Sequence, residues 1–404
     1  MTVSLAAQAG SSVCCVCRRE IIGVPNTSWG GKNAHRHCAT RAFQTSHRQR
    51  PTLTEEQQRA AEAIEAAIEA RKHFNLDGVA GTGKTIVLAN VASRHEDAYL
   101  CAPTAKAASV VTMKTGITAT AVHAVFYRLI EEIEQQDRQP RLVFGTVKEP
   151  GSLRGEVLLL DESSMVNKTM AADIMRIGIT VGDPGQLPPV EGVPFLTEAS
   201  FTLTQIHRQA LENPIVRQAY AVRVGGQYKA DGDAVRVINQ LKSDDLRAAE
   251  VVLTGRRHTR MRMNAEKRRV LDLSNPLPRI GEPLICLRNT PRYGLCNGAI
   301  YYASRDLEEN DQTIGISTDE GDIEVPAIFL TPGHEYDRPE VPPGRWMSVF
   351  SFGYALTVHQ AQGSEFDNVL LIDEWFHENR NRRLYTGLTR AKERIVIARK
   401  GEQL

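Results

Sequence analysis

The sequence has no apolar run long enough to cross a membrane and no start typical of a signal peptide. A spanning helix needs about 20 consecutive apolar residues, and the opening stretch MTVSLAAQAG has neither a basic start nor a sustained apolar segment. Aromatic residues make up only 6% of the 404 residues, and the formal net charge is +1. We therefore expect a soluble, cytoplasmic protein, and a phage-encoded protein would fit this expectation too. The net charge of +1 does not indicate which kind of partner the protein binds.

Cysteine is also scarce, and its seven residues are unevenly placed. Disulfide frameworks are rare in intracellular proteins. We therefore expect the three scattered residues, Cys101, Cys286 and Cys296, to be reduced structural thiols. The other four cysteines fall within residues 1–48, which we interpret as a separate module.

The N-terminal cysteines are spaced like metal ligands. A C-x₂-C pair is followed, after seventeen residues, by an H-x₂-C pair. Three thiolates and one imidazole make a closed tetrahedral site for structural zinc, and the spacing resembles half of a LIM-type or treble-clef module. The predicted ligands are Cys14, Cys17, His35 and Cys38. Cys15 and His37 are competing ligands, and reduced thiols in a disordered tail are the alternative to any site.

Acidic residues are nearly missing from two stretches. Residues 1–50 hold seven Lys or Arg against Glu20 alone, and residues 256–269 hold seven against Glu266 alone. A run of like charge is most often a solvated face. It can also follow the phosphates of a nucleic acid, so both interpretations stay open for both stretches.

A glycine-rich stretch, GVAGTGKT at residues 78–85, has the spacing of a phosphate-binding loop. An alternating apolar stretch precedes it and a helical pattern follows it, which is the required strand, loop and helix. Main-chain N–H groups and the helix N-terminus would hold the phosphates. In this pattern Lys84 reaches the β- and γ-phosphates and Thr85 binds Mg²⁺. An ordinary strand-helix turn is the weaker alternative.

Two acids, Asp161 and Glu162, follow the apolar strand VLLL at residues 157–160. An ATPase needs one carboxylate for Mg²⁺ and another to activate water. We assign Asp161 to the metal and Glu162 to the water. An acid pair after a strand is by itself usually a solvated strand end, and the phosphate-binding loop is what favours the functional interpretation.

The stretch GDPGQLPPV, residues 182–190, predicts a stiff turn because glycines and prolines surround Gln186. Such a turn can hold an amide against a γ-phosphate and report its presence. An ordinary loop is an equal alternative on these residues alone. Strands alternate with helices on both sides of this turn, which predicts an α/β fold with parallel sheets and a ligand at their carboxyl ends.

Taken together in this order, the motifs resemble those of superfamily 1 DNA helicases of the RecD/Dda type, the 5′–3′ branch, over about residues 52–398. The stretches that carry the resemblance are LTEEQQRAA, GVAGTGKT, APTAKAA, LLLDESSM, GDPGQLPP, LTQIHRQ, YALTVHQAQGSEFDNV and YTGLTRAKE. The resemblance implies two RecA-like domains at residues 49–200 and 201–404. It further implies a small wedge insert at about 125–155 and an SH3-like insert at about 282–346.

The resemblance also implies residue roles, with ATP and Mg²⁺ as cofactors. The implied nucleotide-binding residues are Gln57, Gly78, Ala80, Gly81, Thr82, Gly83, Lys84, Thr85, Asp161, Asp183, Gln186, Arg208, Gly363 and Arg390. Those implied to act in hydrolysis are Lys84, Glu162, Gln186, Arg208 and Arg390, the two arginines as fingers that complete the site from the second domain. Those implied to contact nucleic acid are Pro103, Thr104, His123, Thr357 and His359. Single-stranded DNA, duplex junctions, and replication or recombination proteins are the implied partners.

The chain departs from the family pattern at three positions, and each change would remove a DNA-backbone or subdomain contact that the family makes. Ala121 stands where the family often has Thr, and Gln360 and Ala361 stand where it usually has Lys and Ser. We therefore keep three hypotheses: a translocating DNA helicase, a nucleic-acid-binding scaffold with weak ATPase, and a P-loop transferase without nucleic acid. Stimulation of ATP hydrolysis by single-stranded DNA separates the first two, and DNA binding separates both from the third.

Overall fold

The computed structural model describes residues 52–95, 98–122, 157–166, 178–189, 198–206, 212–318, 321–331, 347–374 and 379–399. Elsewhere it describes only the backbone of six strands: β1 (Ser12–Val13), β2 (Glu20–Ile21), β3 (Thr27–Trp29), β4 (Lys32–Ala34), β8 (Tyr127–Gln135) and β9 (Arg138–Thr146). These six form three antiparallel pairs, β1–β2, β3–β4 and β8–β9. None of the described helices has the length and apolar composition needed to cross a membrane.

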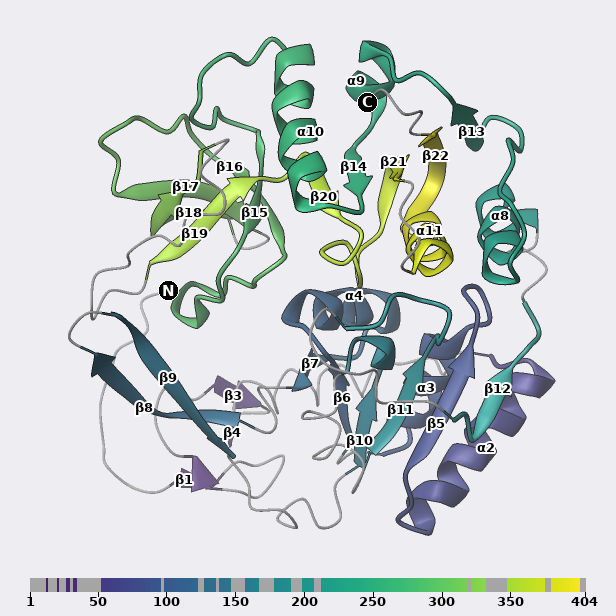
Figure 1. Ribbon diagram of the computed structural model, residues 1–404. Helices are drawn as coiled ribbons and strands as arrows, with labels where there is room; N and C mark the ends of the chain where they lie inside the picture. Colours follow the sequence, from purple (N-terminus) through teal and green to yellow (C-terminus); the bar gives the residue numbers. More distant parts are fainter. Residues whose placement is uncertain are drawn as a thin grey trace.

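The lower sheet in Figure 1 is six-stranded and has the order β12-β5-β11-β10-β6-β7. All of its strand pairs are parallel. Its strands are β5 (Phe74–Gly78), β6 (Ala98–Ala102), β7 (Thr120–Ala121), β10 (Val157–Leu160), β11 (Gly178–Gly182) and β12 (Phe201–Leu203). The central strands are buried on both faces, as parallel sheets covered by helices are. The predicted first parallel sheet is therefore present.

Three helices of the first sheet begin where local sequence favours it: α2 (Glu55–Glu69), α3 (Lys84–Ala92) and α4 (Ala105–Thr115). Thr54 and Gln57 form a reciprocal capping box at the start of α2. The Thr104 hydroxyl caps α4 by accepting from the Ala107 N–H, and Gly116 ends that helix in the left-handed region at φ 64°.

The upper sheet is five-stranded, with the order β13-β22-β21-β14-β20 and parallel pairs throughout (Figure 1). Its strands are β13 (Val235–Ile238), β14 (Val251–Thr254), β20 (Ala355–Thr357), β21 (Phe366–Asp373) and β22 (Ala391–Arg399). The helices around it are α8 (Pro214–Arg223), α9 (Ser243–Ala248), α10 (Arg257–Val270) and α11 (Arg380–Leu388). Side chains of α8 and α11 share one apolar cluster with the sheet, and α9 and α10 share another.

A closed five-stranded β-barrel stands beside the upper sheet (Figure 1). Its strands are β15 (Pro283–Cys286), β16 (Ile300–Ala303), β17 (Thr313–Thr318), β18 (Gly321–Phe329) and β19 (Ser348–Phe352). The barrel occupies the range of about 282–346 in which the resemblance implies an insert, and it extends further because β19 closes it by pairing with β15 and β18. The hairpin β8–β9 lies within the range predicted for the small insert of the first domain.

Two sequence-based expectations need correction. The division at residue 200 is too early, because β12 pairs with β5 and so extends the first sheet. The basic stretch 256–269 is not one solvated or nucleic-acid-facing surface. Lys267 is buried and donates to the Leu246, Arg247 and Ala249 carbonyls, and Arg268 is buried in an ion pair with Glu282. Both cations serve packing, because α10 lies against α9 and the barrel core.

Candidate nucleotide site between the two sheets

The loop at residues 78–85 has the backbone that a phosphate cradle needs. Gly81 and Gly83 have φ values of 84° and 78°, which residues with a Cβ rarely adopt. A Cβ on Gly78 would lie 2.6 Å from the Thr82 hydroxyl. The Lys84 ammonium donates to the Gly78 and Val79 carbonyls at 2.8 and 3.0 Å, so it lies across its own loop.

Thr85 and Asp161 come together as the sequence predicted. The Thr85 hydroxyl donates to Asp161 Oδ2 at 2.7 Å, and Asp161 Oδ1 accepts the Glu162 N–H at 2.8 Å. A hydroxyl and a carboxylate side by side are hard oxygen ligands, which Mg²⁺ prefers. The residues present therefore fit the magnesium ion that the phosphate-binding loop implies.

Glu162 is the most constrained acid of the site. Its φ of 55° lies in the left-handed region, where a non-glycine residue is uncommon. Burial raises the pKa of its carboxyl, while the positive charge of Arg390 opposes that rise. Arg390 lies directly before β22 of the second sheet. The positive charge that most lowers the pKa of Glu162 therefore belongs to the other half of the molecule.

Gln57 lies at the loop but already has protein partners. Its Nε2 donates to the Thr82 carbonyl at 2.9 Å, and its Oε1 accepts the Thr54 N–H at 3.0 Å. The residue is 2% exposed. In this arrangement Gln57 joins the first turn of α2 to the phosphate-binding loop.

The GDPGQLPP turn lies between the sheets and is held by the second one. Leu187 is buried in the apolar cluster of the second sheet. Its N–H donates to the Thr386 hydroxyl and its carbonyl accepts from Gln362 Nε2, each at 2.9 Å. Gln186 is buried, and its Oε1 accepts no hydrogen bond from any part of the chain that the structure describes.

The second sheet also approaches the first domain through Gly363 and Arg390. A Cβ on Gly363 would lie 2.8 Å from the Ala107 Cβ, and its φ is 73°, so glycine is required there twice over. Arg390 is 5% exposed and donates to the Thr386 and Ser364 carbonyls. These bonds hold its guanidinium on the second domain at the seam with Glu162.

The predicted DNA contacts fall into two groups. Pro103 and Thr104 lie between the carboxyl end of β6 and the first turn of α4. Thr357 ends β20 and His359 follows it, but the Thr357 hydroxyl and N–H both donate to Gln360 Oε1. Burial lowers the pKa of His359, and its ring hydrogen-bonds the Pro188 carbonyl of the GDPGQLPP turn. Both groups therefore flank the seam between the sheets.

Several predicted residues lie outside the described part of the chain. They are His123, Arg208, Cys14, Cys17, His35 and Cys38. Their assignments stay predictions. Within the described residues, no group of three or more His, Cys, Asp or Glu side chains could hold a metal ion, and Cys101, Cys286 and Cys296 are free thiols as expected.

Three residues of the site were missed from sequence: Tyr385, Arg223 and Lys106. The Tyr385 hydroxyl accepts the Ala80 N–H of the loop at 2.9 Å, and Arg223 forms an ion pair with Asp183 at 2.8 Å. Lys106 has a buried Nζ with no partner among the described residues, and burial lowers its pKa to about 8. Tyr385 and Lys106 stand inside recognised motifs, so each offered a signal, whereas Arg223 offered none.

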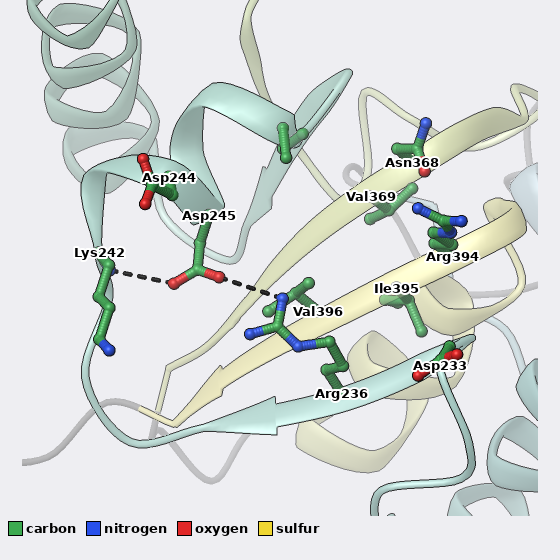
Figure 2. Close-up of a pocket in the computed structure, with 12 residues that line it drawn as sticks. Asp233, Arg236, Lys242, Asp244, Asp245, Asn368, Val369, Arg394, Ile395 and Val396 are labelled. Atoms are coloured by element: carbon green, nitrogen blue, oxygen red, sulfur yellow. Dashed lines mark hydrogen bonds and ion pairs between the residues drawn. The ribbon is translucent and has the colours of Figure 1, made fainter.

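A separate cleft of about 710 Å³ lies between β13, α9 and the middle of β21 and β22 (Figure 2). Asp245 pairs with Arg236 at 3.4 Å, and its carboxylate also accepts the main-chain N–H of Lys242 at 3.2 Å. These contacts cap α9 and join it to β13. The cleft is lined by none of the residues predicted to bind nucleotide, metal or nucleic acid, so we do not assign the chemistry to it.

Comparison with known proteins matches both sheets. A family described as "AAA domain" matches residues 52–242, and one described as "UvrD-like helicase C-terminal domain" matches residues 352–398. The ATP-dependent RecD2 DNA helicase of Deinococcus radiodurans is 30% identical over 363 residues, 80% of this chain and 46% of that protein. The ATP-dependent DNA helicase dda of Enterobacteria phage T4 is 28% identical over 195 residues, 43% of each chain.

The chain thus spans less than half the length of these two relatives. Among solved structures, Bacteroides Pif1 bound to single-stranded DNA aligns with a TM-score of 0.55 and 19% identity over 86% of this chain and 92% of that one. Candida albicans Pif1 aligns with a TM-score of 0.51 and 16% identity, over 86% and 94%. The chain is therefore similar in sequence to the ATP-dependent DNA helicases RecD2 and dda, and it shares its fold with the Pif1 structures.

Proposed function

We propose that the protein is an ATP-dependent DNA helicase that translocates 5′ to 3′ along single-stranded DNA and separates strands. The observation that carries the proposal is the seam itself. The phosphate-binding loop and Glu162 belong to one sheet, while Tyr385 and Arg390, which approach them, belong to the other. ATP bound across such a seam changes the separation of the two bodies when it is hydrolysed, which a motor needs and a switch does not.

The chain's own residues divide the work of hydrolysis. Lys84 neutralises phosphate charge, Thr85 and Asp161 hold the metal, and Glu162 accepts the proton of the attacking water. Mg²⁺, when bound, supplies positive charge that stabilises the transferring phosphoryl group. Arg390 adds positive charge from the second domain, and we propose the same role for Arg208, so hydrolysis depends on domain closure.

A strand-displacement assay tests this function. Duplexes with a 5′ or a 3′ single-stranded tail should be unwound only from the 5′ tail and only with ATP. Lys84→Ala should abolish both hydrolysis and unwinding, because the lost charge lies against the phosphates in a water-poor site. Unwinding from the 3′ tail would overturn the direction, and near-normal turnover in Lys84→Ala would remove the loop from the mechanism.

The runner-up function is a nucleic-acid-binding scaffold with weak ATPase. It is favoured by the residues at two positions where the family has Lys and Ser. Gln360 replaces the lysine and accepts hydrogen bonds from the Thr357 N–H and hydroxyl, and Ala361 replaces the serine and is fully buried. A DNA phosphate would then lose a cation and two donors. Hydrolysis that rises less than about twofold on addition of single-stranded DNA would support the scaffold. Gln360→Lys should strengthen DNA binding under either function.

We also propose that residues 1–48 bind one structural zinc ion through Cys14, Cys17, His35 and Cys38. The support is the ligand spacing alone. Protein purified without chelator should contain about one zinc per chain, lost in a Cys14→Ser/Cys17→Ser variant whose ATPase survives. Zinc-free protein would refute the site without touching the helicase proposal.

A further inference from the structure

A single carboxylate, that of Asp183, links the two domains at the GDPGQLPP turn. Its Oδ1 accepts from Arg223 Nη1 at 2.8 Å and from the Gly185 N–H at 3.0 Å, and its Oδ2 accepts from the Tyr385 hydroxyl. The Asp183 side chain is fully buried, and Arg223 and Tyr385 come from α8 and α11 of the second domain. A buried carboxylate held by donors from another body is costly to leave unpaired.

The same tyrosine reaches the phosphate-binding loop. Its hydroxyl donates to Asp183 and accepts the Ala80 N–H, so one side chain of the second domain contacts both nucleotide motifs of the first. The Arg223 guanidinium lies 5.5 Å from the centre of the Tyr385 ring, which supports both side chains in place. Because main-chain N–H groups of such loops bind phosphates, a shift of the loop is passed directly to α11.

We propose that Tyr385 and Arg223 are positioning residues that clamp Asp183 and couple the nucleotide state of the loop to domain closure and so to DNA binding. The proposal rests on the proposed function and extends it to two residues outside the assigned nucleotide-binding set. Neither residue has to touch nucleotide or DNA. Each acts through Asp183, and Tyr385 acts also through Ala80.

Gly185, in the middle of the turn, gives an independent way to open the clamp. A Cβ on Gly185 would lie 1.7 Å from Arg223 Nη1, so the guanidinium occupies the space that any other residue would need. Gly185 is not among the described residues with positive φ, so alanine brings no backbone strain there. Gly185→Ala therefore displaces Arg223 from the side of the first domain without altering either positioning residue.

The second domain also contains a matched control. The Tyr228 hydroxyl donates to Asp373 at 2.7 Å, and Asp373 pairs with Arg380, so the tyrosine, aspartate and arginine chemistry is repeated. All three control residues lie within the second domain, and Tyr228 is part of the apolar cluster of its sheet. Tyr228→Phe removes a hydrogen bond of the same kind and leaves the seam unchanged.

The test measures the affinity of a fluorescent oligodeoxythymidylate with and without a non-hydrolysable ATP analogue, and takes the ratio as the coupling factor. Tyr385→Phe, Arg223→Met and Gly185→Ala should each lower this factor about five- to tenfold. Tyr228→Phe should leave it within about twofold while lowering the melting temperature by a similar amount to Tyr385→Phe.

The outcomes separate the clamp from the proposed function. Wild-type protein without ATP-dependent DNA binding would overturn the function, whereas wild-type coupling that survives in both Tyr385→Phe and Gly185→Ala would overturn the clamp alone. Equal loss of coupling in Tyr228→Phe would reduce the effect to general destabilisation, and would overturn the clamp too. Nucleotide affinity without DNA should change less than the coupling factor; a larger change would make Tyr385 a direct nucleotide contact and would contradict a positioning role.

Discussion

The same Asp-Glu pair stands at the end of one strand in each sheet, β10 in the first sheet and β21 in the second. The sequence reads LLLDE at residues 158–162 and LLIDE at residues 370–374. In the first sheet, Asp161 accepts a hydrogen bond from the Thr85 hydroxyl of α3, and the positive charge of Arg390 from the other domain acts on Glu162. In the second sheet, Glu374 accepts the N–H groups of Gly255 and Arg256 and the hydroxyl of Thr259.

The difference between these strand ends lies in their partners. Glu374 holds the entry to α10, because it accepts the N–H groups of the two residues before the helix and the Thr259 hydroxyl of its first turn. Asp373 is likewise held by Tyr228 and Arg380. At the end of β10 the acids meet a phosphate-binding loop and a cation from another body. Whether an acid pair after a parallel strand stabilises the fold or takes part in a reaction therefore depends on which groups the neighbouring segments place beside it.

The largest effect should come from removing the cation at the first strand end. Arg390→Ala should lower DNA-stimulated ATP turnover by about 10³- to 10⁵-fold, because an arginine finger stabilises charge on the transferring phosphoryl group. Stopped-flow phosphate release measures this, and circular dichroism checks that the fold is kept. Turnover within tenfold of wild type would make Arg390 a structural residue like Arg380.

Glu162→Gln should lower turnover by about 10²- to 10⁴-fold while ATP affinity is kept, because an amide cannot accept the proton of the attacking water. Equilibrium binding of a fluorescent ATP analogue and steady-state hydrolysis give the two quantities. Affinity that falls as far as the rate would instead assign Glu162 to the metal.

Glu374→Gln, the same change at the other strand end, should spare turnover and cost stability. Its amide nitrogen cannot accept from the start of α10, so we expect a loss of about 1 to 3 kcal/mol in the free energy of unfolding. Urea denaturation followed by tryptophan fluorescence, beside a turnover assay at a temperature where both proteins are folded, separates the effects. A hundredfold loss of turnover here would remove the distinction between the two acid pairs.

The smallest effect concerns Lys106, in the first turn of α4. Its buried Nζ has no partner among the described residues, and Arg390 adds to burial in lowering its pKa to about 8. Lys106→Met should raise the free energy of unfolding at pH 7 by about 1 kcal/mol, because a buried unpaired charge opposes folding.

This gain should shrink as pH rises. The folded pKa lies below the ordinary lysine value of 10.5, so between about pH 8 and that value the unfolded wild-type chain holds more protons than the folded one. Wild-type stability relative to the variant therefore increases with pH over this range. Thermal melts of both proteins at pH 7 and pH 9.5 measure the difference. A constant gap would show that Lys106 is paired in solution.

Much of the fold could be predicted from local sequence. Alternating strands and helices predicted the parallel sheets, and the family resemblance placed an insert at about 282–346, where the barrel lies. The boundary at residue 200 failed because β12 is short, and its pairing with β5 is a long-range contact with no local signature. The interpretation of residues 256–269 as one exposed face was wrong, because a run of charges does not show which of its cations are buried against carbonyls or acids.

By itself, the sequence determined the phosphate-binding loop, the Thr85 and Asp161 pair and the positions of the motifs, since these depend on spacing within single segments. Only the tertiary structure decided which acid pair faces the seam and which caps a helix, and that Arg223 and Tyr385 close on Asp183. The physical reason is that contacts between residues far apart in the sequence depend on how the two sheets pack against each other, which the local sequence around each residue does not encode. Residues 183 and 385 meet across two sheets, and no periodicity in either segment encodes that distance.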